Sequence, residues 1–377
     1  MTKIEADEFG PKYSLKVYDH KLGLEGILVI DNTVLGPGKG GIRMTPDVSE
    51  EEVLRLARAM TWKNALAGIP YGGAKAGIVW KGGSEEKKKA LVQAFAKAFE
   101  KLIPEEYITG PDVNTGEKEM QWFVEATENC DSATGKPASL CNDLFGISNK
   151  AGFPHELGST GFGVAQSTKA AVESMGLEMN GLTVSIHGFG NVGTFTYKFL
   201  SEMGAKVIAI ADKEGALLAK NGFDPKIMDK IIKEGKSITE YSGEAEKISD
   251  KDFWSLKVDV LIPASVTDVI NEDNKEVINA QLIVEGGNIP MRENTEDELF
   301  KKGIMFVPDF VANAGGVISS SAELQGYSKE KMFEIIEERI VKTTKEVINE
   351  SIKTHLNPRA VALSLAKKVI TQAQKEA

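Results

Sequence analysis

The sequence predicts an α/β protein of two domains, the second of which is a doubly wound parallel sheet. Three observations support this prediction. With 377 residues, the chain is longer than a single hydrophobic core usually accommodates. Its first part alternates short β-rich runs with helical periodicity. In its second part, an apolar strand, a glycine-rich turn, a helix and another strand follow one another directly, which is the order of a βαβ unit.

The composition argues against several classes of function. The 45 basic residues are outnumbered by 55 acidic ones, and the net charge of -10 disfavours binding to nucleic acid or to an anionic membrane. No segment approaches the length of a membrane span, and the N-terminus lacks the apolar core of a signal peptide. Cys130 and Cys141 do not make a disulfide framework, and the four histidines are scattered. We therefore expect no metal site and a reducing, cytoplasmic setting.

The first domain is predicted to combine a β-rich sheet with helices. Ser49 and Glu52 carry the signature of a capping box, and the helix that follows them ends before Gly68 and Pro70. The expected strands cover residues 14–19, 26–32, 40–44, 77–80 and 107–109, and the expected helices cover residues 50–67 and 85–102. Residues 131–159 show little periodicity, so we interpret them as loops and a hinge.

Three lysines stand in unusual settings between residues 36 and 78. Lys39 lies in a glycine-rich turn, Lys63 lies near the end of the predicted helix, and Lys75 follows two glycines in a second tight turn. Three converging ammonium groups suit a small molecule with more than one carboxylate, although each lysine alone could be an ordinary solvated residue. Asp112 follows a short strand, at a place where catalytic residues often lie, although a turn aspartate would also fit there.

The second domain begins with the features of a dinucleotide-binding unit. A strand at residues 182–187 leads into the sequence GFGNVG, then a helix, then a strand that ends at Asp212. Glycines permit close approach of the backbone, the helix N-terminus faces the pyrophosphate, and the acid accepts hydrogen bonds from the ribose. The expected cofactor loop consists of Gly188, Phe189, Gly190, Asn191, Val192 and Gly193. An ordinary βα turn is the alternative.

The remaining elements complete a Rossmann-type sheet. Further strands are expected at residues 258–264, 281–288 and 304–310, and a long helix at residues 328–354. Asn357 and Pro358 then begin a last helix as its N-cap and first residue.

Six features occur in a fixed order: Lys63, PYGGAKAGI, PDVNT, GFGNVG, EGGN and ANAGGV. From about Gly26 onward, the chain therefore resembles the glutamate/leucine/phenylalanine/valine dehydrogenase family. The resemblance implies a substrate-binding and catalytic domain at residues 1–157 and an NAD(P)-binding Rossmann domain at residues 158–354. It also implies a cleft that closes during turnover, a C-terminal helix at about residues 355–377 that packs back toward the first domain, and a homohexamer.

The resemblance assigns roles to individual residues. Lys63 would bind the α-carboxylate of the substrate, Lys75 would activate the attacking water, and Asp112 would exchange protons with the substrate amine. A lysine among other cations has its charged form disfavoured, so it can act near neutral pH. Asn288 and Asn313 resemble the amides near the nicotinamide and ribose, although each could also be a turn residue.

Two residues indicate which amino acid is bound. Glutamate enzymes of the family have a lysine directly before the GG-x-R segment, here Lys39, and a serine seven residues after the asparagine of NAGGV, here Ser320. Because a buried ammonium and hydroxyl would be left unpaired by an aliphatic side chain, both residues favour a side-chain carboxylate. Residues 138–157 depart from the pattern of the glutamate enzymes, so their role cannot be transferred.

We therefore expect reversible, NAD(P)-dependent oxidative deamination of L-glutamate to 2-oxoglutarate and ammonium. Asp212 would repel a 2′-phosphate and favours NAD, whereas Lys213 beside it could neutralise one in NADP. The alternatives are the same chemistry on leucine, valine or phenylalanine, and a non-catalytic, NAD(P)-binding regulatory subunit. A 2-hydroxy-acid dehydrogenase is disfavoured because the sequence presents no suitable His–carboxylate pair.

Overall fold

The computed structural model describes residues 6–153 and 157–376, which form two compact units. Unit 1 contains the chain up to Leu157, residues 317–332 and the residues from Ser364 onward, and unit 2 contains residues 158–316 and 333–363. We expected residues 158–354 to stay together, but residues 317–332 pack with unit 1. Residues 1–5, 154–156 and 377, which the sequence assigned to the first domain, the divergent segment and the last helix, lie outside the described residues.

Unit 1 is built on a six-stranded mixed sheet in the order β1-β2-β5-β3-β6, with β4 also paired to β5. Its first two strands are antiparallel to their neighbours, whereas β3 and β4 run parallel to β5. The strands are β1 (Tyr13–Asp19), β2 (Leu24–Asn32), β3 (Gly38–Lys39), β4 (Ile42–Thr45), β5 (Gly72–Val79) and β6 (Tyr107–Ile108).

The predicted turn around Lys75 is wrong, because Gly72 and Gly73 begin β5 and Lys75 lies within it. These glycines allow close packing rather than a reversal of the chain. A Cβ atom on Gly72 would lie 1.7 Å from the carbonyl oxygen of Asn32, and one on Gly73 would lie 2.1 Å from Thr61 Oγ1. Lys39 likewise belongs to β3 rather than to a turn.

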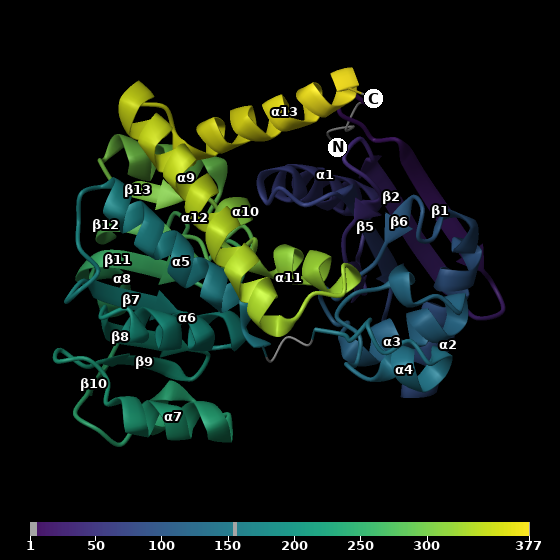
Figure 1. Cartoon of the computed structure of the whole chain (residues 1–377). Coiled ribbons are helices and arrows are strands. Elements are labelled where there is room, and N and C mark those ends of the chain that lie inside the picture. Colours follow the sequence, from purple (N-terminus) through teal and green to yellow (C-terminus); the bar gives the residue numbers. More distant parts are fainter. Residues whose placement is uncertain (1–5, 154–156, 377) are drawn as a thin grey trace. The chain divides into compact units, whose positions relative to one another are not determined.

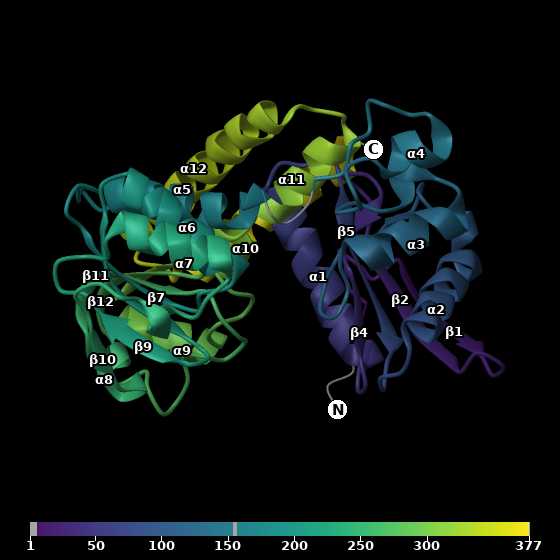
Figure 2. The ribbon, with the colours of Figure 1, turned by 90° about the horizontal axis from the view of Figure 1, so that it is seen from below.

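Helices cover both faces of the unit 1 sheet. α1 (Glu50–Leu66) packs on one face through Val53, Leu54 and Ala57. α2 (Glu85–Ala98) and α3 (Glu117–Thr127) pack on the other, and Figure 2 shows them separated from α1 by the strands. The helix predicted at residues 85–102 is divided into α2 and a short 3-10 helix (Glu100–Leu102). Residues 131–159, which were predicted to be loops, include most of a second 3-10 helix (Cys130–Ser132) and all of α4 (Leu140–Phe145).

Unit 2 is built on a seven-stranded sheet in the order β10-β9-β8-β7-β11-β12-β13, which Figure 1 shows from bottom to top. Five strands are parallel, as the sequence predicted, and β9 and β10 add an antiparallel edge that it did not predict. The strands are β7 (Thr183–His187), β8 (Lys206–Asp212), β9 (Gly215–Leu218), β10 (Glu246–Ile248), β11 (Lys257–Pro263), β12 (Asn279–Val284) and β13 (Met305–Val307).

The helices of unit 2 connect these strands. They are α5 (Ser159–Ser174), α6 (Asn191–Glu202), α7 (Pro225–Glu234), a 3-10 helix (Ile238–Glu240), α8 (Asp250–Ser255), α9 (Glu293–Lys301), α10 (Asp309–Ala312) and most of α12 (Lys329–Thr354). Three helices have residues in both units: α12, α11 (Gly315–Leu324) and α13 (Pro358–Glu376). Among the described residues, no helix combines the length and the hydropathy needed to cross a bilayer.

A buried ionic cluster holds the start of α13 within unit 2. The guanidinium of Arg359 donates hydrogen bonds to Glu285, Glu296 and Asp309, at distances between 2.5 and 3.2 Å. Burial and the neighbouring carboxylate of Glu296 raise the pKa of Glu285 well above its usual value. Burial beside a second carboxyl group therefore disfavours ionisation of Glu285.

Candidate functional site

Lys75 and Asp112 form an ion pair within unit 1. Lys75 Nζ lies 3.1 Å from Asp112 Oδ1, and the two side chains are 8% and 13% exposed. Lys75 comes from the middle of β5, and Asp112 follows β6 by four residues, as the sequence predicted. Burial raises the pKa of Asp112, but the charges of Lys75 and Arg43 outweigh this effect and lower it. The pair therefore provides an ionised carboxylate beside an ammonium group, which suits proton exchange.

Lys39 is a buried cation with a hydroxyl partner. Its Nζ donates a hydrogen bond of 2.8 Å to Thr134 Oγ1, and the residue is 3% exposed. Burial lowers its pKa to about 8; Glu323 opposes this shift, and Lys136 and Lys75 add to it. An ammonium group held in so dry a place favours an anionic partner, because a neutral or apolar ligand would leave the charge uncompensated.

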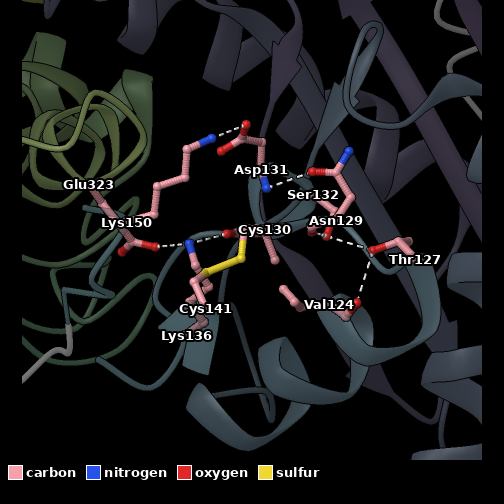
Figure 3. Close-up of a disulfide and its surroundings, with 11 residues drawn as sticks. Val124, Thr127, Asn129, Cys130, Asp131, Ser132, Lys136, Cys141, Lys150 and Glu323 are labelled. Carbon is pink, nitrogen blue, oxygen red and sulfur yellow. Dashed lines mark hydrogen bonds and ion pairs between the residues drawn. A yellow bond between two sulfur atoms is a disulfide. The ribbon is translucent and has the colours of Figure 1, made fainter. Parts of the chain in front are cut away.

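A buried ion pair supports the segment that contacts Lys39. Lys136 Nζ donates a hydrogen bond of 2.6 Å to Glu323 Oε1, and the side chains are 2% and 1% exposed. Glu323 also accepts hydrogen bonds from the backbone N–H groups of Gly135 and Phe153. The carboxylate of α11 thereby holds the residues that follow Thr134. Figure 3 shows Lys136 between this carboxylate and the disulfide of Cys130 and Cys141.

Ser320 lies one helical turn before Glu323 on α11, within unit 1. It is half-buried, whereas its neighbours Ser319 and Ser321 are buried, and Ser321 accepts a hydrogen bond from Gln325. Of the three serines, Ser320 is therefore the one that is not fully buried. Its proposed contact with the substrate side chain stays a prediction.

Cys130 and Cys141 form a disulfide, a pairing that was not predicted from the sequence. The bond closes a loop of residues 131–140, which contains Thr134 and Lys136 (Figure 3). No local pattern pairs these two cysteines, because their Cα atoms come within 5.9 Å only after residues 130–141 have folded back.

Lys63 is half-buried on the last turn of α1. The next residue, Asn64, donates hydrogen bonds of 3.2 Å to the carbonyl oxygen of Lys39 and of 2.6 Å to that of Gly72. These bonds fix the end of α1 against β3 and β5, the strands that carry Lys39 and Lys75. The structure thus places all three predicted lysines on joined elements of one unit.

In unit 2, the sequence GFGNVG forms the turn between β7 and α6. A Cβ atom on Gly193 would lie 1.8 Å from the carbonyl oxygen of Gly188, so only glycine allows this approach of helix to turn. A Cβ atom on Gly190, at the N-cap of α6, would meet nothing within 4 Å. An open position at the start of a helix fits a pyrophosphate, which binds backbone N–H groups there. The other residues of the predicted loop, Phe189, Asn191 and Val192, follow the same turn.

Asp212 ends β8, as predicted, and its carboxylate has partners within the protein. Oδ1 accepts a hydrogen bond from the N–H of Glu214, and Oδ2 accepts hydrogen bonds from Ser237 Oγ and from the N–H of Ile238, each 2.8 Å long. Asp212 therefore fixes the 3-10 helix that begins at Ile238. The ammonium of Lys213 is exposed and lies 3.7 Å from Glu214.

Asn288 and Asn313 are adjacent in unit 2. The side-chain amide of Asn313 donates hydrogen bonds to Asn288 Oδ1 at 3.1 Å and to the carbonyl oxygen of Gly287 at 3.0 Å. The next residue, Ile289, has a φ of +48° and donates from its N–H to Asp309. Asn313 and Asp309 thus stabilise the turn at residues 285–289, which contains EGGN. The predicted amides of Asn288 and Asn313 therefore belong to one hydrogen-bonded structure.

Four polar residues of unit 1 were not predicted from the sequence, because their roles depend on distant partners. They are Arg43, Thr134, Lys136 and Glu323. Their local sequence carries no signal of burial, but Arg43 stands in the GG-x-R segment itself and could have been considered. Within the described residues, no group of three or more His, Cys, Asp or Glu residues is arranged to hold a metal ion.

Comparison with known proteins relates both units to enzymes. Residues 152–377 match the family described as Glutamate/Leucine/Phenylalanine/Valine dehydrogenase, and residues 13–129 match the Glu/Leu/Phe/Val dehydrogenase dimerisation domain. The chain is 36% identical over 332 residues to the glutamate dehydrogenase of Aeropyrum pernix, covering 84% of this chain and 77% of that protein. It is 38% identical over 312 residues to the NADP(+)-dependent glutamate dehydrogenase of Pyrobaculum calidifontis, covering 79% and 72%.

Solved structures share the fold. A hetero-hexameric glutamate dehydrogenase from Thermus thermophilus superposes with a TM-score of 0.80 at 27% identity, covering 96% of this chain and 89% of that one. L-tryptophan dehydrogenase from Nostoc punctiforme superposes with a TM-score of 0.74 at 26% identity, covering 98% of both chains.

Proposed function

The chain belongs to the glutamate/leucine/phenylalanine/valine dehydrogenase family and is an amino-acid dehydrogenase, and we propose that its substrate is L-glutamate. The reaction is a reversible oxidative deamination. L-glutamate, water and NAD(P)+ give 2-oxoglutarate, ammonium, NAD(P)H and a proton. The curated relatives named above are glutamate dehydrogenases, which supports this choice of substrate.

One observation carries the choice of glutamate: Lys39 is a buried ammonium whose side-chain hydrogen bond goes to the neutral hydroxyl of Thr134. A side-chain carboxylate would compensate its charge, and the hydroxyl of Ser320 would add a donor. An aliphatic side chain would leave the ammonium without an anion, which costs several kcal/mol as an order of magnitude. Unit 1 therefore favours a substrate with two carboxylates.

Each catalytic residue then has a defined task. Lys63 binds the α-carboxylate, and Lys75 holds the oxygen of the oxo acid and orients the attacking water. Asp112, 3.1 Å from Lys75, takes a proton from the amine or returns it as ammonia leaves. Because the two groups are held by β5 and by the turn after β6, they are in place before the substrate arrives.

The turn between β7 and α6 would hold a nicotinamide dinucleotide. When bound, this cofactor accepts the hydride that leaves the substrate Cα. The open position at Gly190 and the N-terminus of α6 fit the pyrophosphate, and Asp212 lies where a ribose is expected. Asn288 and Asn313 would present their amides to the nicotinamide and its ribose.

The preference between NAD and NADP is a separate proposal. The carboxylate of Asp212 favours NAD, whereas the Pyrobaculum calidifontis relative is named NADP(+)-dependent, so the expected preference for NAD has no support from the relatives. We propose that the site accepts either ribose form, because Asp212 is already held by Ser237 and Ile238 and Lys213 is exposed beside it.

The proposed function is tested by following the reduction of NAD+ and NADP+ with glutamate, leucine, valine, phenylalanine and tryptophan in parallel. We expect turnover of glutamate with at least one cofactor. Turnover of another amino acid alone would refute the assignment of substrate. Cofactor binding without any turnover would instead support a regulatory subunit.

A second candidate is a dehydrogenase for an apolar or aromatic amino acid. The observation that favours it is the full-length match with L-tryptophan dehydrogenase, which covers 98% of both chains. The buried charge of Lys39 opposes it, since an indole or isopropyl group cannot compensate an ammonium. The same parallel assay distinguishes the two candidates.

We further propose that the enzyme is a homohexamer and works in the cytoplasm, where nicotinamide cofactors and 2-oxo acids are metabolised. The structural relative from Thermus thermophilus is described as hetero-hexameric, which supports the number of subunits. The disulfide between Cys130 and Cys141 opposes a reducing location, because such bonds are rare there. Light scattering would give the number of subunits, and thiol titration directly after cell lysis would give the redox state.

A further inference from the structure

Arg43 and Lys75 contact different oxygens of the Asp112 carboxylate. Arg43 Nε donates a hydrogen bond of 2.8 Å to Asp112 Oδ2, whereas Lys75 approaches Oδ1. The two oxygens of one carboxylate are thus held by two different cations. Arg43 is 14% exposed, and its Nη1 contacts Glu52, the residue expected to close a capping box at the start of α1.

The backbone around Arg43 is fastened to the turn that carries Asp112. Ile42 donates its N–H to Gly110, and Met44 donates its N–H to Val113. The side chains of Thr115 and Asn114 donate in return to the carbonyl oxygens of Ile42 and Met44. Hydrogen bonds on both sides of Arg43 therefore fix β4 relative to Asp112. A surface ion pair does not need backbone hydrogen bonds of this kind on both sides of the arginine.

We propose that Arg43 is a positioning residue of the deamination reaction, which holds Asp112 Oδ2 and leaves Oδ1 as the oxygen that exchanges protons. This inference rests on the proposed function, in which Asp112 is the proton carrier. An arginine keeps its proton throughout the physiological range, so its hydrogen bond makes Oδ2 the less basic oxygen of the carboxylate. The proton is thereby directed to the oxygen that faces Lys75.

Arg43 also keeps Asp112 ionised during the reaction. The ionisable groups that face Asp112 are Lys75 from β5, Arg43 from β4 and Tyr107 from β6, with Glu52 of α1 behind Arg43. Burial raises the pKa of Tyr107, so its hydroxyl stays neutral. When Lys75 gives up a proton, Arg43 remains as a permanent cation beside the carboxylate. Without it, burial would raise the pKa of Asp112.

The test compares Arg43→Gln, Arg43→Lys and the control Arg58→Gln. Arg58 is a suitable control because it also links α1 to aspartates, Asp7 and Asp31, and is 19% exposed.

For Arg43→Gln we expect kcat to fall about tenfold to 100-fold, with the KM for the cofactor unchanged. We expect the acidic limb of the kcat/KM profile to move up by about one pH unit. Arg43→Lys should keep the limb near its original pH but recover only part of kcat, because a point charge lacks the fixed geometry of Nε.

Arg58→Gln should lower the melting temperature and leave the pH profile unchanged. An unchanged kcat and pH limb in Arg43→Gln would overturn the proposal, as would an equal shift of the limb in Arg58→Gln. If Arg43→Gln does not fold, the test uses Arg43→Lys instead. A kcat of Arg43→Lys equal to that of the parent would then contradict the proposal.

The assays use whichever amino acid the parent turns over fastest, so they do not depend on the choice of glutamate. A parent that turns over no amino acid would refute the proposed function instead. The effect of Arg43 is then measured by infrared titration of carboxylate bands, with Asp112→Asn as the subtraction reference. We expect Asp112 to protonate at higher pH in Arg43→Gln than in the parent, and identical titrations would overturn the proposal.

Discussion

Lys136 and Glu323 form a buried ion pair 2.6 Å long although they lie 187 residues apart in the chain. Through this pair, α11 is joined to the segment that carries Thr134, the hydroxyl partner of Lys39. Glu323 also favours the charged form of Lys39. One carboxylate therefore supports both the position and the protonation of Lys39, the residue that we propose selects the substrate.

Replacing Glu323 with glutamine should lower stability and weaken glutamate binding together. Loss of the carboxylate leaves Lys136 as an uncompensated buried charge, which costs about 3 kcal/mol in the free energy of unfolding. It also removes the anion that raises the pKa of Lys39, so the KM for glutamate should rise. The matched control is Glu125→Gln, which breaks the half-exposed pair with Lys89 and should cost less than about 1 kcal/mol. Equal losses in the two variants would contradict this account.

Replacing Lys39 with leucine should abolish the preference for glutamate. We expect kcat/KM for glutamate to fall by at least about 1,000-fold, because the side-chain carboxylate loses its cationic partner. Activity on leucine should fall far less. Lys12→Leu is the control, since Lys12 forms a partly exposed pair with Glu106 and should leave both activities unchanged. Undiminished glutamate turnover in Lys39→Leu would show that the carboxylate binds elsewhere.

The pKa of Lys39, about 8, predicts a pH dependence of glutamate binding. Above this pH the free enzyme loses the ammonium proton, so the KM for glutamate should rise while the KM for the cofactor stays constant. The effect on stability has the opposite sign. The unfolded lysine titrates near 10.5, so the unfolded state binds more protons between about 8 and 10.5, and the contribution of Lys39 to stability rises with pH in that window. Lys39→Leu should lack both effects.

Replacing Asp212 with asparagine should shift the cofactor preference toward NADP. Removing one negative charge beside the expected 2′-phosphate should raise the ratio of kcat/KM for NADP to that for NAD by about tenfold. Asparagine keeps an oxygen that can accept a hydrogen bond, so the 3-10 helix after Ser237 should stay in place. Asp224→Asn serves as the control, because Asp224 caps α7. An unchanged ratio would mean that Asp212 acts only through Ser237 and Ile238.

Removing the disulfide should affect the amino-acid site more than the cofactor site. Cys141→Ser opens a loop with a sequence separation of 11, which should cost about 3 kcal/mol relative to the oxidised parent. Because Thr134 and Lys136 lie within that loop, the KM for glutamate should rise and the KM for the cofactor should not. The parent treated with dithiothreitol should behave like the variant. If reduction changes neither stability nor KM, the thiols are unpaired in the working enzyme.

The sequence by itself determined the fold class, the parallel core of unit 2 and the glycine-rich turn between β7 and α6. These features depend on neighbours in the chain: the apolar run of β7, the glycines after it and the acid that ends β8. Local patterns of this kind can be recognised without knowledge of distant partners. Asp112 could be placed for the same reason, because it follows a short strand directly.

Tertiary structure alone decided which elements carry Lys39 and Lys75 and which polar groups contact them. The glycines before Lys75 suggested a turn, but close contacts with Asn32 and Thr61 make them part of β5. The antiparallel strands β9 and β10 are short and carry no long apolar run, so periodicity could not find them. The bond from Lys39 to Thr134 joins residues 95 positions apart. Which polar groups are buried against one another depends on how the chain packs, and a local pattern does not record that.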